Sequence, residues 1–262
     1  MSMSLTKRND AAFIRTSQIL LLVGGLLVWE IGARLGFSNV TWTSSPTRIA
    51  QEFWSSMMAG ELPGHLRVTL TEALAGLAAG ATVGILLGMV LGVSRVLGAI
   101  IEPFIMALNC LPRVALGPLI VMYLGIGFAS KFALAFSLVV VPMMINVFEG
   151  IRSTDPVLVN LMRTVGASRM QVFFKLLLPN CIPWIFSALR VSISFAMIGA
   201  IVGEFISARA GIGYMIDTAA GAYDVTAMLM PLIVLMLVTF TFDRLFVLLR
   251  NRLLRWRAES ET

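Results

Sequence analysis

The chain has 262 residues, of which 58% are hydrophobic and 13% are charged, and its mean hydropathy is +0.90. Because about a quarter of the residues in a soluble globular domain are charged, this composition excludes the soluble class and indicates an integral membrane protein. The formal net charge of +6 does not by itself point to nucleic acid, since basic residues in a membrane chain first report on which side each loop lies.

The N-terminal quarter is predicted to contain one membrane span and one surface helix. Residues 1–16 form a polar, basic tail, and residues 17–37 form an apolar run that is long enough to cross a bilayer. No small-residue cleavage site follows at the distance typical of a signal peptide, so we expect the span to be retained. In the segment 38–66, Ser45-Pro46 opens an amphipathic helix that ends at Gly60 and is expected to lie on the outer membrane surface.

A glycine at every fourth position marks the second span, which begins near Arg67. Each glycine in a soluble helix costs about 1 kcal/mol relative to alanine, so five in one helix favour close packing against a neighbouring membrane helix. Because four residues advance by about 400°, the row of glycines drifts around the helix and leaves room for more than one partner. The five residues are Gly76, Gly80, Gly84, Gly88 and Gly92.

The third predicted span, residues 99–124, is interrupted by prolines and carries charges. Proline kinks a helix, and irregular backbone at membrane depth persists only inside protein or beside a wet cavity. A central arginine costs about 2.5–3.5 kcal/mol on insertion scales, so Arg113 is not expected to face lipid. It either lines a pathway through the membrane or is held for structure alone, by snorkelling or by a carboxylate. The pathway candidates in this span are Glu102, Pro112, Arg113 and Pro118.

Three further spans are predicted at residues 131–148, 184–206 and 227–249. The stretch 211–224 is too short and too broken to cross a bilayer, so it is expected to form a loop or a half-inserted hairpin. Glu204, near the end of the fifth span, has two readings: an interfacial carboxylate or a gate residue of the pathway.

The polar and basic segment 150–183 separates the fourth span from the fifth. Asp155-Pro156 is typical of a helix start, because the aspartate can cap the helix and the first turn does not need the N–H that proline lacks. Apolar residues then recur at helical spacing, and Gly166 stands where a left-handed C-terminal residue is favoured. Ser168 can cap a second short segment, residues 169–178, which is expected to end at the prolines before the next span.

Six spans place both termini on the same side of the membrane. Thirteen basic residues lie on that side, in the tails, the turn at Arg95 and the segment 150–183, against five on the other side. The positive-inside rule therefore predicts cytoplasmic termini, including the basic tail 251–262, and a cytoplasmic loop at 150–183. Membrane topology then explains the net charge, and no nucleic-acid partner is expected.

Gly166, nine intervening residues and then Leu176-x-Leu178-Pro179 resemble the cytoplasmic signature loop of permease subunits of ATP-driven, binding-protein-dependent importers. The family pattern places Glu-Ala-Ala before the glycine, where this chain has Asn160, Leu161 and Met162. Other stretches, within roughly residues 45–250, resemble the nitrate, sulfonate, taurine and bicarbonate branch of that family. They are Ser45-Pro46, Leu111-Pro112 to Gly125-Ile126-Gly127, Gly150-Ile151-Arg152 with Asp155-Pro156, and Glu204 with Gly211-Ile212-Gly213-Tyr214.

The resemblance implies an all-α polytopic fold of about six transmembrane helices, like that of type I ABC importer permeases, in a bacterial inner membrane. It implies two copies of this chain, or this chain with a similar one, fed by an external substrate-binding protein and driven by separate cytoplasmic ATPase subunits. The solute would be a small anion such as a sulfonate, taurine, nitrate or bicarbonate, although relatives also import aromatic and pyrimidine-type nutrients. The residues that would dock on the ATPase are Asn160, Leu161, Met162, Arg163, Thr164, Gly166, Ala167, Ser168, Arg169, Leu178 and Pro179.

The chain lacks a Gly-x-x-x-x-Gly-Lys-Ser/Thr phosphate-binding motif, so ATP is expected to be used by a partner and no cofactor is expected here. Two rival classes stay open. In an ATP-independent channel or ion-coupled carrier, Arg113 and Glu102 would select ions. A membrane-embedded enzyme is the other, but the sole histidine, His65, has no acid-and-serine arrangement nearby, and Cys110 and Cys181 have no metal-binding spacing.

Overall fold

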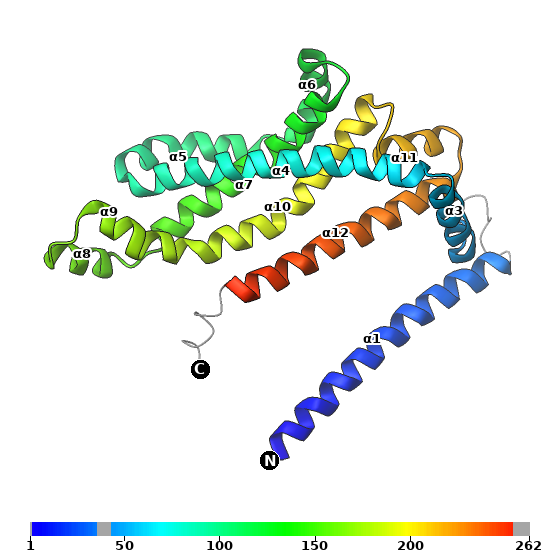
Figure 1. Cartoon of the computed structure of the whole chain (residues 1–262), viewed down its shortest axis with the longest axis horizontal. Coiled ribbons are helices and arrows are strands. Elements are labelled where there is room, and N and C mark those ends of the chain that lie inside the picture. Colours follow the sequence, from blue (N-terminus) through cyan, green and yellow to red (C-terminus); the bar gives the residue numbers. More distant parts are fainter. Residues whose placement is uncertain (1, 36–42, 254–262) are drawn as a thin grey trace. The chain divides into compact units, whose positions relative to one another are not determined.

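The computed structural model describes residues 2–35 and 43–253, which are helical except for short turns and contain no strand (Figure 1). Most of the expected basic tail, 251–262, lies outside the described residues. The helical elements, in chain order, are α1 (Ser2–Arg34), α3 (Pro46–Met58), α4 (Glu61–Val93), α5 (Arg95–Cys110), the 3-10 turn η1 (Arg113–Leu116), α6 (Gly117–Leu124), α7 (Phe128–Arg152), α8 (Pro156–Thr164), α9 (Arg169–Val172), the π-helical turn η2 (Phe173–Leu177), α10 (Leu178–Ser207), α11 (Ile212–Gly221) and α12 (Val225–Leu253).

Within the described ranges, five helical stretches are long and apolar enough to cross a membrane, and one bent pair of helices supplies a sixth candidate span. The five are Phe13–Arg34, Glu61–Val93, Phe128–Arg152, Arg169–Ser207 and Val225–Arg250, and the pair is Arg95–Cys110 with Arg113–Leu124. The all-α fold with about six spans, expected from composition and resemblance, is thereby confirmed.

The chain divides into two compact units, residues 1–62 with 215–233 and residues 63–214 with 234–262. In the first unit, α3 begins at a capped end, where the Ser45 hydroxyl accepts a hydrogen bond from the Arg48 N–H. Glu30, near the end of α1, accepts hydrogen bonds from the Arg34 guanidinium at 2.7 Å and from the Thr47 N–H at 3.1 Å. The hydrogen bond from the Thr47 N–H to Glu30 ties the start of α3 to the end of α1.

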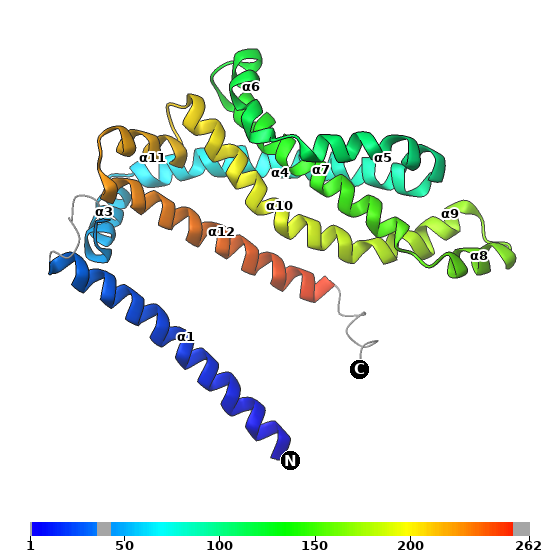
Figure 2. The same ribbon diagram turned by 180° about the vertical axis from the view of Figure 1, so that it is seen from behind.

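In the second unit, α7 lies between α4 and α10. Every glycine of the α4 row faces α7, and the residues opposite also recur at every fourth position: Ala135, Val139, Met143, Val147 and Ile151. Both numberings rise together, so α4 and α7 run parallel. On the other side, Gly199 lies against Ala135 and Gly203 against Lys131, so α10 runs antiparallel to α7 (Figure 2). The glycine row therefore meets a single partner helix, although its sequence spacing left room for several.

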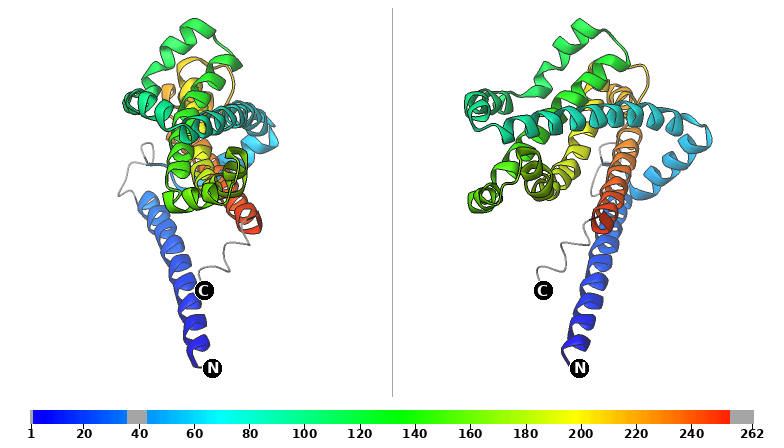
Figure 3. Two further views of the ribbon diagram at one scale, coloured as in Figure 1. Left: turned by 90° about the vertical axis from the view of Figure 1, so that its left-hand side faces the viewer. Right: turned by 60° about the vertical axis from the view of Figure 1, so that its left-hand side comes forward.

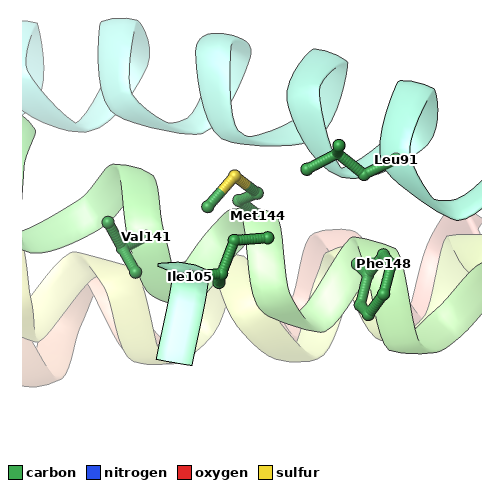
Figure 4. Close-up of a cluster of buried hydrophobic side chains, with 5 residues drawn as sticks. All are labelled: Leu91, Ile105, Val141, Met144 and Phe148. Atoms are coloured by element: carbon green, nitrogen blue, oxygen red, sulfur yellow. The ribbon is translucent and has the colours of Figure 1, made fainter. Parts of the chain in front are cut away.

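The bent span is held against this pair of helices by a small apolar cluster. Leu91 of α4, Ile105 of α5, and Val141, Met144 and Phe148 of α7 are all buried and form one cluster where the three helices meet (Figure 4). Five side chains from three helices thus fix α5 at the end of α4 and α7 that precedes the 153–168 segment. Because lipid tails are as apolar as these side chains, the cluster stabilises the arrangement through close packing of its atoms.

The break in the third span falls where the sequence has Pro112. The helices on either side are bent by 77° (Figure 3). Pro112 stands between α5 and η1, and Pro118 lies in the first turn of α6, where the missing N–H has no helical partner to lose. Pro112 thus lies in the break between α5 and η1, and Pro118 lies just inside α6 after the 3-10 turn, whereas Pro103 lies inside α5.

The segment that begins at Arg169 does not end at the prolines, so the prediction of a separate short helix there is wrong. A continuous helical stretch runs from Arg169 to Ser207 and includes the π-helical turn. Pro179 follows that turn and occupies the start of α10, where its missing N–H is tolerated. The fifth span therefore begins before residue 184 and incorporates the second half of the predicted loop.

Candidate functional site

The first candidate site is the short helix α8, whose two ends are closed by hydrogen bonds. At its start, the Asp155 carboxylate accepts from the Val157 N–H at 2.8 Å. At its end, the Ala167 N–H donates to the Met162 carbonyl at 2.9 Å and the Gly166 N–H to the Arg163 carbonyl at 3.0 Å. This pair of bonds is a Schellman motif, and Gly166 supplies the positive φ of +81° that the motif needs.

The corner after α8 is closed in the same way. Ser168 and Gln171 form a capping box, in which the Gln171 N–H donates to the Ser168 hydroxyl at 3.2 Å and the Ser168 N–H donates to the Gln171 side-chain oxygen at 2.7 Å. The Asn180 amide also donates to the Thr154 hydroxyl at 2.9 Å, which ties the end of α7 to the start of α10. Sequence reasoning missed this pair, because its two members are far apart in sequence and neither belongs to a motif.

α8 presents large apolar side chains to the outside. Leu161 is 58% exposed and Val165 at its end is 75% exposed, and Val157 and Leu158 lie exposed on the same side. The opposite side, with Pro156, Val159 and Arg163, lines a pocket formed with the α4–α5 corner. A polar or charged exterior is the rule for a solvated helix, so this exposed apolar side is suited to contact with another protein.

The structure brings most of the residues assigned to docking onto this one loop. It lies at the end of α7 and α10, as Figure 1 shows. Positions 160–164 lie on α8, positions 166–168 form the corner, Arg169 begins α9, and Leu178 with Pro179 opens α10. Asn160, at the glutamate position of the family pattern, is exposed, and its carbonyl accepts from the Thr164 hydroxyl at 3.0 Å.

The pathway candidates are not brought together. Arg113 donates to the Ser137 carbonyl at 3.1 Å and to the Asn109 side-chain oxygen at 3.0 Å, so it bridges the break in the third span to α7. Glu102 instead pairs with Arg152 at 2.8 Å, at the end of α7 that leads into the loop. Within the part of the chain that the structure describes, Arg113 and Glu102 thus have different partners, and these contacts do not form a common ion-selecting site. Both oxygen atoms that accept from Arg113 are neutral, whereas a carboxylate partner was one of the alternatives predicted from the sequence.

Glu204 lies in a buried polar cluster. Its side chain is enclosed by protein, and the residue is 1% exposed. The two predictions for Glu204, an interfacial carboxylate or a gate residue, did not include this burial. One oxygen accepts from the Thr69 hydroxyl at 2.7 Å and the other from the Gly213 N–H at 2.6 Å. The Ile212 N–H donates to the Thr69 hydroxyl at 2.8 Å, and the Gly211 N–H donates to the His65 Nδ1 at 2.9 Å. The carboxylate therefore fastens the loop between α10 and α11 onto α4.

Two further charged residues complete this cluster. Glu72 and Lys131 interact electrostatically with Glu204 and are 4% and 3% exposed. The Lys131 ammonium donates to the Ser207 carbonyl, so the start of α7 is tied to the end of α10. Sequence analysis placed Lys131 at the start of the fourth span, among the five basic residues on the outer side, and did not single out Glu72. A signal was present, because His65, Thr69 and Glu72 fall on one side of an otherwise apolar helix.

The same cluster explains two glycines of the stretch that resembles the family. A β-carbon at Gly213 would lie 2.8 Å from the Glu204 β-carbon, and Gly211 has a φ of +117°, which side-chain-bearing residues rarely adopt. The motif Gly211-Ile212-Gly213 thus allows three successive backbone N–H groups to reach buried side chains, and the last of them, that of Gly213, reaches the Glu204 carboxylate. These contacts position the loop between α10 and α11 against α4.

Comparisons with known proteins show the family and the fold of this chain. A sequence profile described as binding-protein-dependent transport system inner membrane component matches residues 80–255. The riboflavin transport system permease protein RibX of Chloroflexus aurantiacus is 37% identical over 89% of this chain and 87% of its own length. The Escherichia coli protein named as an aliphatic sulfonates transport permease, SsuC, is 33% identical over 93% of this chain and 92% of its own length. An inward-facing structure of the MetNI methionine ABC transporter shares the fold, with a TM-score of 0.64 and 19% identity over 76% of this chain and 96% of that chain.

Proposed function

Because this chain belongs to the family of inner membrane components of binding-protein-dependent transport systems, we propose that it forms, with a second permease chain, a solute pathway driven through α8. It is a multi-pass membrane protein and the permease subunit of an ABC importer. It is not an enzyme, since hydrolysis of ATP belongs to a separate subunit of such importers. ATPase and substrate-binding partners follow from the same class.

The observation that carries the proposal is a rigid helix with an exposed apolar side at the end of two spans. The Schellman motif, the capping box and the Asn180–Thr154 bond hold α8 at a fixed angle to α7 and α10. A force applied to α8 is therefore passed to both spans rather than absorbed by the loop. The exposed Leu161 and Val165 side chains supply the apolar contact that a cytoplasmic ATPase subunit would cover.

The orientation follows from charge. The excess of basic residues on the side of the termini supports a cytoplasmic location for both termini and for α8. The same orientation puts the Glu204 cluster and the α10–α11 loop on the outer side, where a substrate-binding protein delivers its solute. The membrane would be the inner membrane of a bacterium.

The second permease chain is proposed to be another copy of this one, and the solute a small anion such as a sulfonate, taurine, nitrate or bicarbonate. The similarity to a sulfonate permease and the sequence branch support an anion, and Arg113 at the break in the third span is suited to one. The similarity to a riboflavin permease makes an aromatic nutrient the competing solute class. Identifying the ligand held by the cognate binding protein decides between the two.

The docking role is tested by Leu161→Asp, with Ser153→Asp as the charge-matched control just before the same helix. Burial of a leucine is worth about 1.5–3 kcal/mol, so placing a charge there is expected to weaken association with the ATPase subunit at least tenfold. Ser153→Asp adds the same charge at an exposed position outside the docking residues without removing apolar surface, and it should associate like the wild type. Titration of detergent-purified permease with the ATPase subunit measures both. Equal affinity of Leu161→Asp and the wild type would refute docking on this side of α8.

A further inference from the structure

A large pocket lies behind α8, on the side away from its exposed apolar residues. It encloses about 940 Å³ and is lined by the end of α4, the start of α5, the end of α7, the inner side of α8, and the α9–η2 segment. Four arginines line it: Arg95, Arg152, Arg163 and Arg169. Among the residues that the structure describes, no carboxylate lines it. Only Arg152 has an ion-pair partner in this part of the chain, namely Glu102. The pocket therefore carries a positive charge that the described chain leaves uncompensated.

The pocket sits at the level where spans end. The candidate span of α4 ends at Val93, that of α7 ends at Arg152, and the next begins at Arg169, and all three residues lie at or beside the pocket. The ends of three apolar helices define the boundary between the hydrocarbon core and the polar headgroups. A ligand in this pocket would thus lie at headgroup depth.

The remaining lining is mixed, which limits the kind of ligand. Ile151, Val172, Phe173 and Leu177 provide apolar walls, and Ser94 and Thr154 provide hydroxyl groups. A free inorganic anion would use the guanidinium and hydroxyl groups and leave the apolar walls bare. An amphiphile with an anionic head uses both.

The pocket lies on the other side of α8 from the exposed Leu161 and Val165, and it is lined by three residues that the resemblance assigns to docking: Arg163, Ala167 and Arg169. Its lining residues on that helix, Pro156, Val159 and Arg163, are three and four positions apart and so share one side. The exposed Leu161 and Val165 do not line it. One helix thus offers two different surfaces, and an ATPase subunit seated on the apolar one leaves the arginine side to another ligand.

We propose that this pocket binds the phosphate of an anionic phospholipid headgroup, with the start of an acyl chain along its apolar walls. Basic pockets between helices at the cytoplasmic surface are suited to such headgroups. The lipid would fill the space between the α4–α5 corner and α8, and so brace the loop against the second unit's core. The proposal does not depend on docking of an ATPase and is tested without one.

The test uses the full-length permease in nanodiscs of neutral phosphatidylcholine, titrated with fluorescent phosphatidylglycerol and, separately, with phosphatidylcholine carrying the same chains. Phosphatidylglycerol is expected to bind more tightly, and Arg95→Gln with Arg163→Gln is expected to weaken it roughly 25-fold, at about fivefold for each arginine. Arg95→Lys should keep most of the affinity for phosphatidylglycerol, because lysine keeps the positive charge at this exposed position. The matched control is Arg244→Gln with Arg250→Gln, which removes the same charge from α12, outside the pocket lining.

The outcomes separate the possible ligands. Equal binding of the two lipids, or equal loss in the control double variant, would overturn the proposal in favour of diffuse electrostatic attraction. Displacement of phosphatidylglycerol by inorganic phosphate at similar affinity would also overturn it and assign the pocket to a soluble anion. Leu161→Asp should retain lipid binding even though it is expected to lose the ATPase, so failure of the lipid proposal and failure of the docking proposal give different results.

Discussion

Replacing Gly84 by alanine tests how closely α4 packs against α7. A β-carbon at this position would lie 2.7 Å from the Met143 β-carbon and 2.7 Å from the Val140 carbonyl oxygen. Ordinary contact begins at about 3.4 Å for such atoms, and the carbonyl belongs to the backbone and cannot rotate away. The two helices must therefore separate by most of an ångström along a row of close contacts.

The expected cost combines three effects. Alanine is favoured over glycine in a helix by about 1 kcal/mol, whereas overpacking a well-packed interior costs about 1–3 kcal/mol. Separation of the helices also weakens the contacts at Gly80 and Gly88, because a gap of 0.5–1 Å forfeits roughly a quarter to a half of the dispersion energy. We expect a net loss of about 1–2 kcal/mol. In a chain of this size that corresponds to an apparent Tm lower by roughly 3–6 °C.

The matched control is Gly64→Ala, in the same helix. A β-carbon at Gly64 meets no atom within 4 Å, so only the gain in helix propensity remains and the apparent Tm should stay level or rise. Both variants are heated in one detergent, and the fraction that still elutes as a single species on size exclusion is measured against temperature. A Gly84→Ala protein as stable as Gly64→Ala would show that α4 and α7 are not packed backbone to backbone.

Three further outcomes follow from the contacts around the loop and the buried cluster. Glu204→Gln leaves one oxygen for two donors, the Thr69 hydroxyl and the Gly213 N–H, and so should destabilise the fold by about 1–3 kcal/mol. Hydrogen exchange should be faster at the Gly213 amide or at the Ile212 amide, which donates to the Thr69 hydroxyl, and unchanged exchange at both would contradict the assignment. Gly166→Ala should force a side chain into the left-handed region at a cost of about 1–2 kcal/mol and lower transport-coupled ATPase activity in proteoliposomes, whereas full coupling would show that the corner need not be fixed. Glu102→Gln should change the apparent Tm little, because the side chains of Glu102 and its partner Arg152 are 39% and 31% exposed, and exposed ion pairs contribute about 0–1 kcal/mol. A large drop in Tm would mean that the pair is shielded from water.

The sequence was most informative where the determinants of structure are local. The caps of α8 at Asp155 and Gly166 involve residues within a few positions of each other, so residue type and spacing suffice to predict them. The glycine row on α4 is also a local pattern, and it predicted close packing. Its partner, α7, could not be identified, because any apolar helix with small side chains at the right depth would serve equally well.

The buried cluster shows why other features escaped prediction. Lys131 follows a glycine-rich turn and reads as a solvated residue at the start of a span. Its burial arises only when α4 brings Glu72 and α10 brings Glu204 to the same place, and those residues are separated by more than a hundred positions. The predicted orientation is unaffected, because leaving Lys131 out of the count lowers the outer side from five basic residues to four against thirteen.

The contacts at the two ends of α7 and α10 indicate how motion of α8 would travel. At the end beside the loop, the Asn180–Thr154 hydrogen bond ties the two helices, and at the other end Lys131 donates to the Ser207 carbonyl. Glu204 then joins α10 to Thr69 of α4, which is packed along α7 through its glycines. Three helices fastened at both ends and packed along their length resist sliding, so displacement of α8 is expected to tilt them together. The bent third span meets this block at its break, where Arg113 donates to the Ser137 carbonyl of α7 and Gly117 lies against Ile206 of α10, so relative motion between the span and the block would change the surroundings of the Arg113 charge.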